Sequence, residues 1–239
     1  MSNELSGKRA LVTGGGRGIG REIALHLARA GADVALVART ERQLRKVAEE
    51  VEALGRQALV LPADISQGEQ VDALAQEVHG RWGAVDLLVN NAAVFARGRV
   101  WELPVADWDR VLNTNLRGVF LVTRAFLPEM LKRKSGTIVM ISSTSGKRAD
   151  PGGAAYSTSK FGLMGFAQSL LYDVRKHNVR VIVVSPSWVD TSVVDPESVA
   201  KEGPGSRLRA EDVAQAVVDA VSLPPRALVR EIELWATNP

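Results

Sequence analysis

Short apolar segments rich in β-branched residues alternate with longer amphipathic segments along most of the chain. The short segments have the length of strands, and the longer ones repeat their apolar residues at the helical period. Strands are predicted at residues 10–13, 34–38, 58–61, 87–90, 137–141, 181–185 and 231–235. Helices are predicted at residues 18–30, 41–54, 67–82, 105–132, 154–177 and 210–222. This alternation is typical of a doubly wound α/β fold, in which helices cover both faces of a seven-stranded parallel sheet.

One long segment interrupts the alternation. Residues 192–208 contain two prolines and two glycines and follow the sixth predicted strand. In a compact domain, a long irregular segment is more often a functional lid than a linker. Because open α/β sheets bind ligands at the carboxyl ends of their strands, we expect a substrate loop at about residues 188–208.

Length and composition fit one domain. The chain has 239 residues, of which 46% are hydrophobic and 24% are charged, and it contains no cysteine. Disulfides, thiolate chemistry and cysteine metal sites are therefore excluded. No apolar run approaches the roughly 20 residues that span a bilayer, and the first residues lack the apolar core of a secretion signal. We expect a single-domain cytoplasmic enzyme that does not bind membranes.

The charge pattern does not indicate a nucleic-acid partner. The formal net charge is +3, and basic residues are interspersed with acidic ones as on solvated helix faces. The three histidines, His26, His79 and His177, lie in helical, charged segments and share no ligand spacing. We assign them neither a catalytic role nor a metal.

A glycine-rich turn follows the first predicted strand. Gly14, Gly18 and Gly20 have the spacing Gly-x-x-x-Gly-x-Gly, and Arg17 and Ile19 lie between them. Gly14 would permit a tight turn, and Gly18 would let the backbone approach a pyrophosphate at a helix N-terminus. Gly20 would allow the helix to pack closely on the strand. Between a strand and a helix, this turn predicts a dinucleotide site.

The residue after the second strand bears on the choice of cofactor. An acidic residue there would bind the ribose hydroxyls of NAD, but this chain has Arg39. A guanidinium group suits the oxygens of a 2′-phosphate, and Arg17 could supply a second cation. Asp33 precedes the strand and is expected at its opposite end. We predict NADP(H), with a solvated surface role for Arg39 as the alternative.

Tyr156 and Lys160 are four residues apart and share one face of a predicted helix. A phenol has a pKa of about 10, and a nearby cation favours its ionised form, so we expect Lys160 to lower the pKa of Tyr156. Ser143 ends an apolar strand, where its hydroxyl could bind a carbonyl oxygen; Ser142 is the alternative. These residue types indicate interconversion of a carbonyl and an alcohol.

In their order and spacing, these motifs resemble the classical short-chain dehydrogenase/reductase family, whose domain is a Rossmann fold. The resemblance extends from about Gly7 to the C-terminus. Within the family it is strongest to members like 3-oxoacyl-acyl-carrier-protein reductase. The supporting stretches begin at Leu127, Ile141, Tyr156, Val174 and Leu234.

The resemblance implies a catalytic tetrad of Asn115, Ser143, Tyr156 and Lys160. Tyr156 would give a proton to the substrate oxygen while the reduced nicotinamide supplies a hydride, and Ser143 would stabilise the developing oxyanion. Lys160 would also bind the nicotinamide ribose, beside Tyr156. Asn115 would anchor a water relay to the lysine.

Further cofactor contacts are implied by the same resemblance. Asp64 and Ile65 match the adenine contact after the third strand, although Asp64 could instead cap the next helix. Asn91 belongs to a motif that follows the fourth strand. Val189 would meet the nicotinamide carboxamide, and Thr191 would lie near the phosphates.

Two positions depart from the family pattern, because Ala93 and Ser187 stand where relatives have glycine. Ala93 adds a methyl group near the cofactor. Ser187 raises the question whether its turn needs a positive φ, which is uncommon outside glycine. Its neighbour Trp188 could line the substrate pocket or serve only in packing.

The leading hypothesis is an NADP(H)-dependent reductase of a 3-oxoacyl thioester, either a small molecule or linked to an acyl carrier. The alternatives are another carbonyl substrate, such as a sugar, polyol, steroid or small ketone, and a dinucleotide-binding protein without turnover. Arg97, Arg99, Lys147 and Arg148 are expected in loops at the carboxyl edge, where they could meet an acidic carrier or be solvated.

The resemblance also implies a homo-oligomer, a tetramer or a dimer, built from the helices at 105–132 and 154–177 with the last helix and strand. Gly162 and Gly165 lie inside the second of these helices. Glycine weakens a helix, so both positions suggest close packing against a neighbour.

Overall fold

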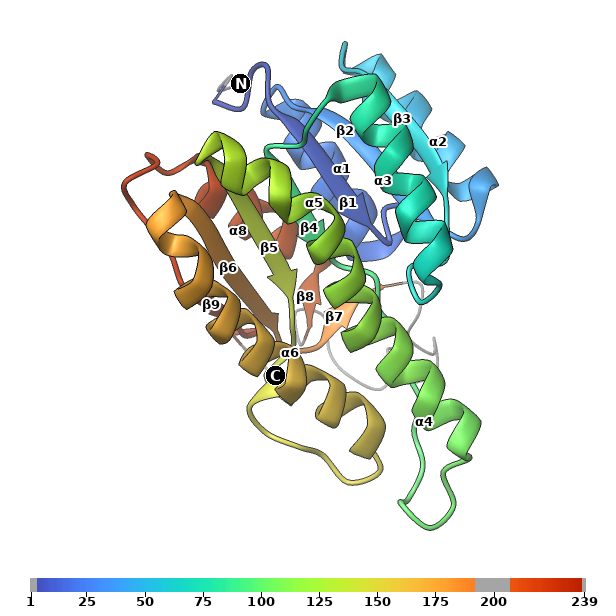
Figure 1. Cartoon of the computed structure of the whole chain (residues 1–239). Helices are drawn as coiled ribbons and strands as arrows, with labels where there is room; N and C mark the ends of the chain where they lie inside the picture. Colours follow the sequence, from blue (N-terminus) through green and yellow to red (C-terminus); the bar gives the residue numbers. More distant parts are fainter. Residues whose placement is uncertain (1–3, 192–206, 238–239) are drawn as a thin grey trace.

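Figure 1 shows the computed structural model, which describes residues 4–191 and 207–237. Its main sheet has seven parallel strands in the order β3-β2-β1-β4-β5-β6-β9. The strands are β1 (Arg9–Thr13), β2 (Asp33–Ala38), β3 (Ala58–Pro62), β4 (Leu87–Asn90), β5 (Gly136–Ile141), β6 (Val179–Pro186) and β9 (Glu231–Leu234). The order reverses between β1 and β4, so a ligand-binding switch point lies at their carboxyl ends. The predicted fold is confirmed.

Helices cover both faces of this sheet, with α3, α5 and α6 on the near face in Figure 1. The helices are α1 (Gly18–Arg29), α2 (Glu41–Ala53), α3 (Gly68–Trp82), α4 (Val105–Leu112), α5 (Val119–Arg133), α6 (Ala154–Val174) and α8 (Ala210–Ser222). No helix within residues 4–191 and 207–237 is long and apolar enough to cross a membrane.

Two apolar cores flank the sheet, because successive residues of a strand point to opposite faces. In β5, Val139 and Ile141 pack in the core formed with α1, α2 and α8, whereas Ile138 and Met140 pack in the core formed with α3, α5 and α6. Burial on both faces explains why the strands are continuously apolar instead of alternating with polar residues.

The predicted helix at 105–132 is not regular. A π-helical segment, η1 (Asn113–Gly118), separates α4 from α5. Such segments add a residue to a helical turn and often occur at functional sites. Since the apolar periodicity continues on both sides, the sequence does not reveal the interruption. Asn115 lies within it and is buried.

The region predicted as a substrate loop begins and ends in a short sheet. Strand β7 (Val189–Asp190) pairs in parallel with β8 (Leu208–Arg209). Residues 192–206 of the predicted loop lie outside the described residues.

Candidate active site

The carboxyl ends of the central strands bring most of the predicted site residues to one edge of the sheet, the lower edge in Figure 1. The turn after β1, the loops after β4 and β5, and the start of α6 meet there. This edge holds two groups of residues, a glycine cradle and a polar cluster around Tyr156.

The glycine cradle is formed as its spacing predicts. Gly14 and Gly18 have positive φ angles of 68° and 55°, which suit glycine because a Cβ is disfavoured there. A Cβ on Gly20 would overlap the carbonyl oxygen of Gly14 and the side-chain amide of Asn91. The N-terminus of α1 therefore lies directly against the turn and leaves backbone N–H groups facing the sheet edge.

Thr13 and Asn91 fasten this turn to the loop after β4. The Thr13 hydroxyl accepts hydrogen bonds from the backbone N–H groups of Asn91, at 3.0 Å, and Ala92, at 3.1 Å. The Asn91 side chain donates to the Thr13 carbonyl at 2.9 Å. No role was assigned to Thr13 from the sequence, although a polar residue at the end of an apolar strand can indicate one.

Ala93 has no positive φ and fits without backbone strain.

Arg17 and Arg39 are both exposed, Arg17 at the start of α1 and Arg39 directly after β2. Within the described part of the chain, neither side chain makes a hydrogen bond or an ion pair with another residue. Ile19 is half-buried and packs against the core on the α1 side. Asp33 begins β2 at the opposite edge, where it accepts a hydrogen bond from the backbone of Gln57.

Asp64 stabilises the turn that precedes α3. One carboxylate oxygen accepts from the backbone N–H of Ser66 at 2.9 Å and from its hydroxyl at 2.8 Å. Asp64 therefore does not cap α3, whose N-cap residue is Gln67 without a side-chain cap. The contact with Ser66 occupies only one of the two carboxylate oxygens. Ile65 is buried against Gly118, which has no room for a Cβ at that contact.

Val189 and Thr191 lie beyond β6. Val189 is buried in β7, and the Thr191 methyl group lies 3.6 Å from the position that a Cβ would take on Gly18. Thr191 is therefore beside the glycine cradle.

Ser187 has no positive φ, and its N–H donates to the Leu234 carbonyl at 2.8 Å, so the turn does not need glycine. Trp188 is exposed and lies under the guanidinium of Arg207.

Ser143 lies near Tyr156 and favours the ionised form of its phenol, which acts to lower the pKa of Tyr156. The Ser143 hydroxyl oxygen accepts a hydrogen bond from the backbone N–H of Ser145 at 3.1 Å. Ser142, the alternative, is buried away from this pair, and its hydroxyl has no hydrogen-bond partner within the described residues. The geometry therefore favours Ser143 as the group that would bind a substrate oxygen.

Lys160 is buried beneath Tyr156 and is only 3% exposed. Its ammonium group donates to the Ile141 carbonyl at 2.8 Å and lies 5.5 Å from the centre of the Tyr156 ring. Burial lowers the pKa of Lys160 to about 8, because the charged form loses its hydration.

The pKa of Tyr156 is raised, so the expectation that Lys160 would lower it is wrong for this arrangement. Burial of the phenol has the larger effect, and Ser143 only partly opposes it. The Lys160 ammonium is directed to the Ile141 carbonyl and not to the phenol oxygen. Tyr156 is consequently protonated throughout the neutral range.

Asn115 links the loop after β4 to α6. Its side-chain oxygen accepts from the N–H of Val94 at 2.8 Å, and its amide nitrogen donates to the Val94 carbonyl at 2.9 Å and the Ser159 hydroxyl at 3.1 Å. These bonds occupy the side chain, so a water relay to Lys160 would have to use the backbone of η1. The tetrad residues are thus brought to one place, with Asn115 supporting it from behind.

Phe95 forms a wall of this site that the sequence reading missed. Its ring meets the Tyr156 ring edge to face, with centroids 5.0 Å apart.

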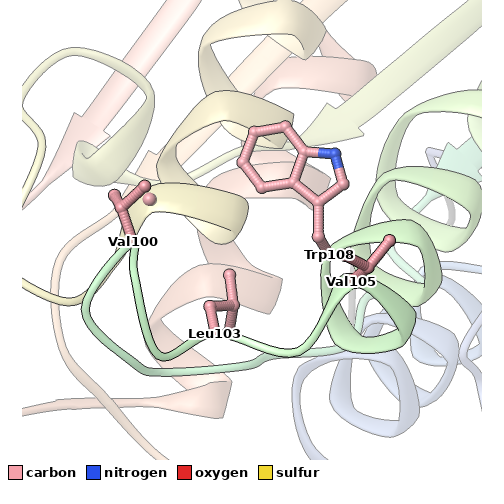
Figure 2. Close-up of a pocket in the computed structure, with 5 residues that line it drawn as sticks. Val100, Leu103, Val105 and Trp108 are labelled. Atoms are coloured by element: carbon pink, nitrogen blue, oxygen red, sulfur yellow. The ribbon is translucent and has the colours of Figure 1, made fainter.

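A separate apolar cavity of about 180 Å³ lies between the loop after β4, α4 and the first residue of α6. Figure 2 shows its lining residues Val100, Leu103, Val105 and Trp108. It contains no ionisable group and none of the tetrad.

Comparisons with known proteins agree with this geometry. The model of the short chain dehydrogenase family matches residues 8–202. The chain belongs to this family. A 3-oxoacyl-[acyl-carrier-protein] reductase FabG of Staphylococcus aureus is 35% identical over 189 residues, which are 79% of this chain and 77% of that protein.

Solved structures of family members superpose over nearly the whole chain. A metagenomic short-chain oxidoreductase in complex with NADP has a TM-score of 0.87 and 35% identity, covering 99% of this chain and 100% of that one. An alcohol dehydrogenase of Thermococcus sibiricus complexed with 5-hydroxy-NADP has a TM-score of 0.89 and 29% identity, covering 97% of each chain.

Replacing Lys160 with methionine tests how strongly its burial opposes folding. The shift of its pKa from 10.5 to about 8 corresponds to about 3 kcal/mol against folding at pH 7. Between about pH 8 and 10.5 only the unfolded chain keeps this proton, so the wild type gains stability as the pH rises. The free energy of unfolding of Lys160→Met at pH 7 should therefore exceed that of the wild type by up to about 3 kcal/mol. Loss of the hydrogen bond to the Ile141 carbonyl reduces this gain. The difference in the free energy of unfolding should shrink toward pH 10.

Urea unfolding at several pH values measures the difference in the free energy of unfolding. Lys46→Met, which changes an exposed lysine of α2, should keep the pH dependence of the wild type. A difference between Lys160→Met and wild type that stays constant from pH 7 to 10 would contradict the lowered pKa.

Proposed function

We propose that the chain is an NADP(H)-dependent reductase that converts the carbonyl of a 3-oxoacyl thioester to a secondary alcohol. The observation that carries this proposal is that Ser143 and the buried ammonium of Lys160 both lie beside Tyr156. When bound, the reduced cofactor would supply the hydride for the carbonyl carbon.

The side chains would handle the oxygen and its proton. Tyr156 keeps its proton at neutral pH because burial raises its pKa, so nearly every molecule would hold the acid needed for reduction. The Ser143 hydroxyl would donate a hydrogen bond to the same oxygen as negative charge develops there. Lys160, with a pKa of about 8, is an ionisable group that can resupply a proton to the buried site.

The cradle fits a dinucleotide phosphate. Gly14, Gly18 and Gly20 carry no side chains, so the turn and the start of α1 can approach a phosphate closely. The N-terminus of a helix favours an anion. The exposed guanidinium groups of Arg17 and Arg39 suit the additional 2′-phosphate. The NADP and 5-hydroxy-NADP in the two structural relatives support the same choice.

The substrate class is supported by the acyl-carrier name of the Staphylococcus aureus relative. An acidic carrier would need free basic residues near the entrance. Lys147 pairs with Glu231 and Glu233, and Arg148 lies 3.8 Å from Glu233. Arg97 and Arg99 are exposed and make no ion pair within the described residues, so we expect any contact with the carrier to fall on these two. A small ketone is the second candidate, favoured by the alcohol dehydrogenase among the structural relatives.

NADPH oxidation with acetoacetyl-CoA and with acetoacetyl-acyl-carrier protein tests the proposed reaction. Tyr156→Phe removes only the acidic hydroxyl, so kcat should fall on the order of 10²–10⁴-fold. Tyr172→Phe is the matched control, because that tyrosine is exposed on the same helix and should leave kcat unchanged. NADPH binding without turnover of either thioester or of small ketones would favour a non-catalytic binding protein.

Cofactor choice is tested with Arg39→Asp. Replacing the cation by an anion should lower the preference for NADPH over NADH, measured as the ratio of their kcat/KM values, by at least about tenfold, because a charged hydrogen bond becomes a repulsion. Arg226→Asp makes the same charge change at the other edge of the sheet and should not alter the ratio. An unchanged ratio in Arg39→Asp would remove Arg39 from the cofactor site.

The face formed by α5 and α6 exposes several large apolar side chains. Phe120 and Phe161 are 48% and 46% exposed, and a Cβ on Gly165 would meet no atom within 4 Å. Gly162 instead packs within the chain, against Leu116. Exposed large apolar side chains that gather on one face of a protein mark an interaction site. We infer that two copies of the chain associate through this face, as part of a dimer or tetramer.

Gly165→Arg should separate these copies. The new side chain would fill the space that the partner helix needs, so sedimentation velocity should show a smaller species than for the wild type. Gly80→Arg is the matched control, since Gly80 is an exposed helical glycine of α3 with the same open surroundings. A wild type that sediments as a monomer would contradict the inference.

A further inference from the structure

A network of charged side chains joins the turn after Ser143 to the last strand of the sheet. The Lys147 ammonium lies 2.6 Å from a carboxylate oxygen of Glu231 and also pairs with Glu233. The indole N–H of Trp235 donates to Glu233 at 2.7 Å. Arg148 lies beside the same carboxylate, with its guanidinium 4.8 Å from the centre of the Trp235 ring.

The turn between Ser143 and Lys147 is short and internally bonded. It is the 3₁₀ segment η2 (Thr144–Gly146). The Gly146 N–H donates to the Ser143 carbonyl at 2.9 Å, and the Lys147 N–H donates to the Thr144 carbonyl at 3.0 Å. The Ser143 hydroxyl itself accepts from this turn, through Ser145. Movement of Lys147 would therefore be transmitted to both polar groups of Ser143.

The other end of the network lies on a firm support. Glu231 and Glu233 are two residues apart in β9, so their side chains point to the same face, and β9 is held in register by β6. Residues 147–151 are exposed and offer the turn little packing. Gly146 packs against Lys160 and Met164 of α6 and so holds the inner part of the turn. The two carboxylates hold its outer end, through Lys147.

The energy of the network is too small for it to serve mainly in stability. Its side chains are 27–70% exposed, and single ion pairs in such positions contribute about 0–1 kcal/mol. Position matters far more at a reacting centre, where a displacement of about 1 Å can cost on the order of 10²-fold in rate. The network is suited to fixing geometry.

We propose that Lys147 is a positioning residue, which holds the Ser143 hydroxyl against Tyr156 by tying the intervening turn to Glu231 and Glu233. The proposal rests on the proposed function for its effect on turnover. Its structural effect, on the position of Ser143 beside Tyr156, does not depend on the substrate.

The kinetic test compares Lys147→Met with Lys147→Arg. Loss of the ion pairs should lower kcat about tenfold or more with a smaller change in KM for NADPH, whose cradle is built by other loops. Arginine can still reach both carboxylates and should restore most of kcat. Arg45→Met, which removes the exposed pair of Arg45 and Glu41 on α2, is the control and should leave kcat unchanged.

A spectroscopic test needs no turnover. The chain has two tyrosines, so in a Tyr172→Phe background the tyrosinate absorbance reports Tyr156 alone. Ser143 and the ammonium of Lys160 are the polar groups that face this ring in the described structure, and Phe95 covers its other side. Ser143 favours the phenolate of Tyr156, so displacement of Ser143 in Lys147→Met should move the titration of Tyr156 to higher pH, and Lys147→Arg should move it back.

The two tests separate this inference from the proposed function. A shifted titration in an enzyme that reduces no carbonyl would keep the positioning role and reject the proposed reaction. Turnover in the wild type with unchanged kcat and titration in Lys147→Met would reject the positioning role and keep the reaction. The charges of β9 would then serve only to protect the edge of the sheet from pairing with other strands.

Discussion

The buried ammonium of Lys160 is the constraint on which the rest of the site depends. An ammonium group with so little access to water must have a fixed acceptor, and the Ile141 carbonyl at the end of β5 provides it. This bond ties the start of α6 to the end of β5, while the buried apolar residues of α6 pack the rest of the helix on the sheet. It places Tyr156, one turn earlier on the same helix, over the end of β5, where Ser143 follows. Burial of this charge opposes folding, and the two apolar cores on either side of the sheet compensate for its cost.

The surrounding structure restrains this arrangement from several directions. Asn115 bonds to both Val94 and Ser159, so the π-helical segment joins α6 to the loop after β4. Thr13 and Asn91 join that loop to the glycine cradle. The cofactor-binding half and the proton-transfer half of the proposed site are thereby linked by buried and partly buried hydrogen bonds, which gain strength in a poorly hydrated environment.

Most of the fold could be predicted from sequence because its strands are short apolar runs between regular amphipathic helices. The cradle was also accessible, since Gly14 and Gly20 have conformations and contacts that only glycine satisfies. The π-helical segment was not, because one added residue leaves the periodicity on both sides intact. The roles of Thr13 and Phe95 depend on segments distant in the chain. The direction of the Tyr156 pKa was mispredicted because helical spacing places a lysine near a tyrosine but does not give burial or the acceptor that the ammonium chooses.

The central claim is that this site transfers a hydride to a carbonyl carbon and a proton from Tyr156 to its oxygen. The most direct measurement is mass spectrometry of the product formed from an acetoacetyl thioester with NADPH dideuterated at C4 of the nicotinamide. The account predicts one deuterium at the new carbinol carbon, and a rate of formation of this product that is on the order of 10²–10⁴-fold lower in Tyr156→Phe. A deuterated alcohol formed equally well by Tyr156→Phe, or cofactor binding with no deuterated alcohol from any carbonyl tested, would contradict it.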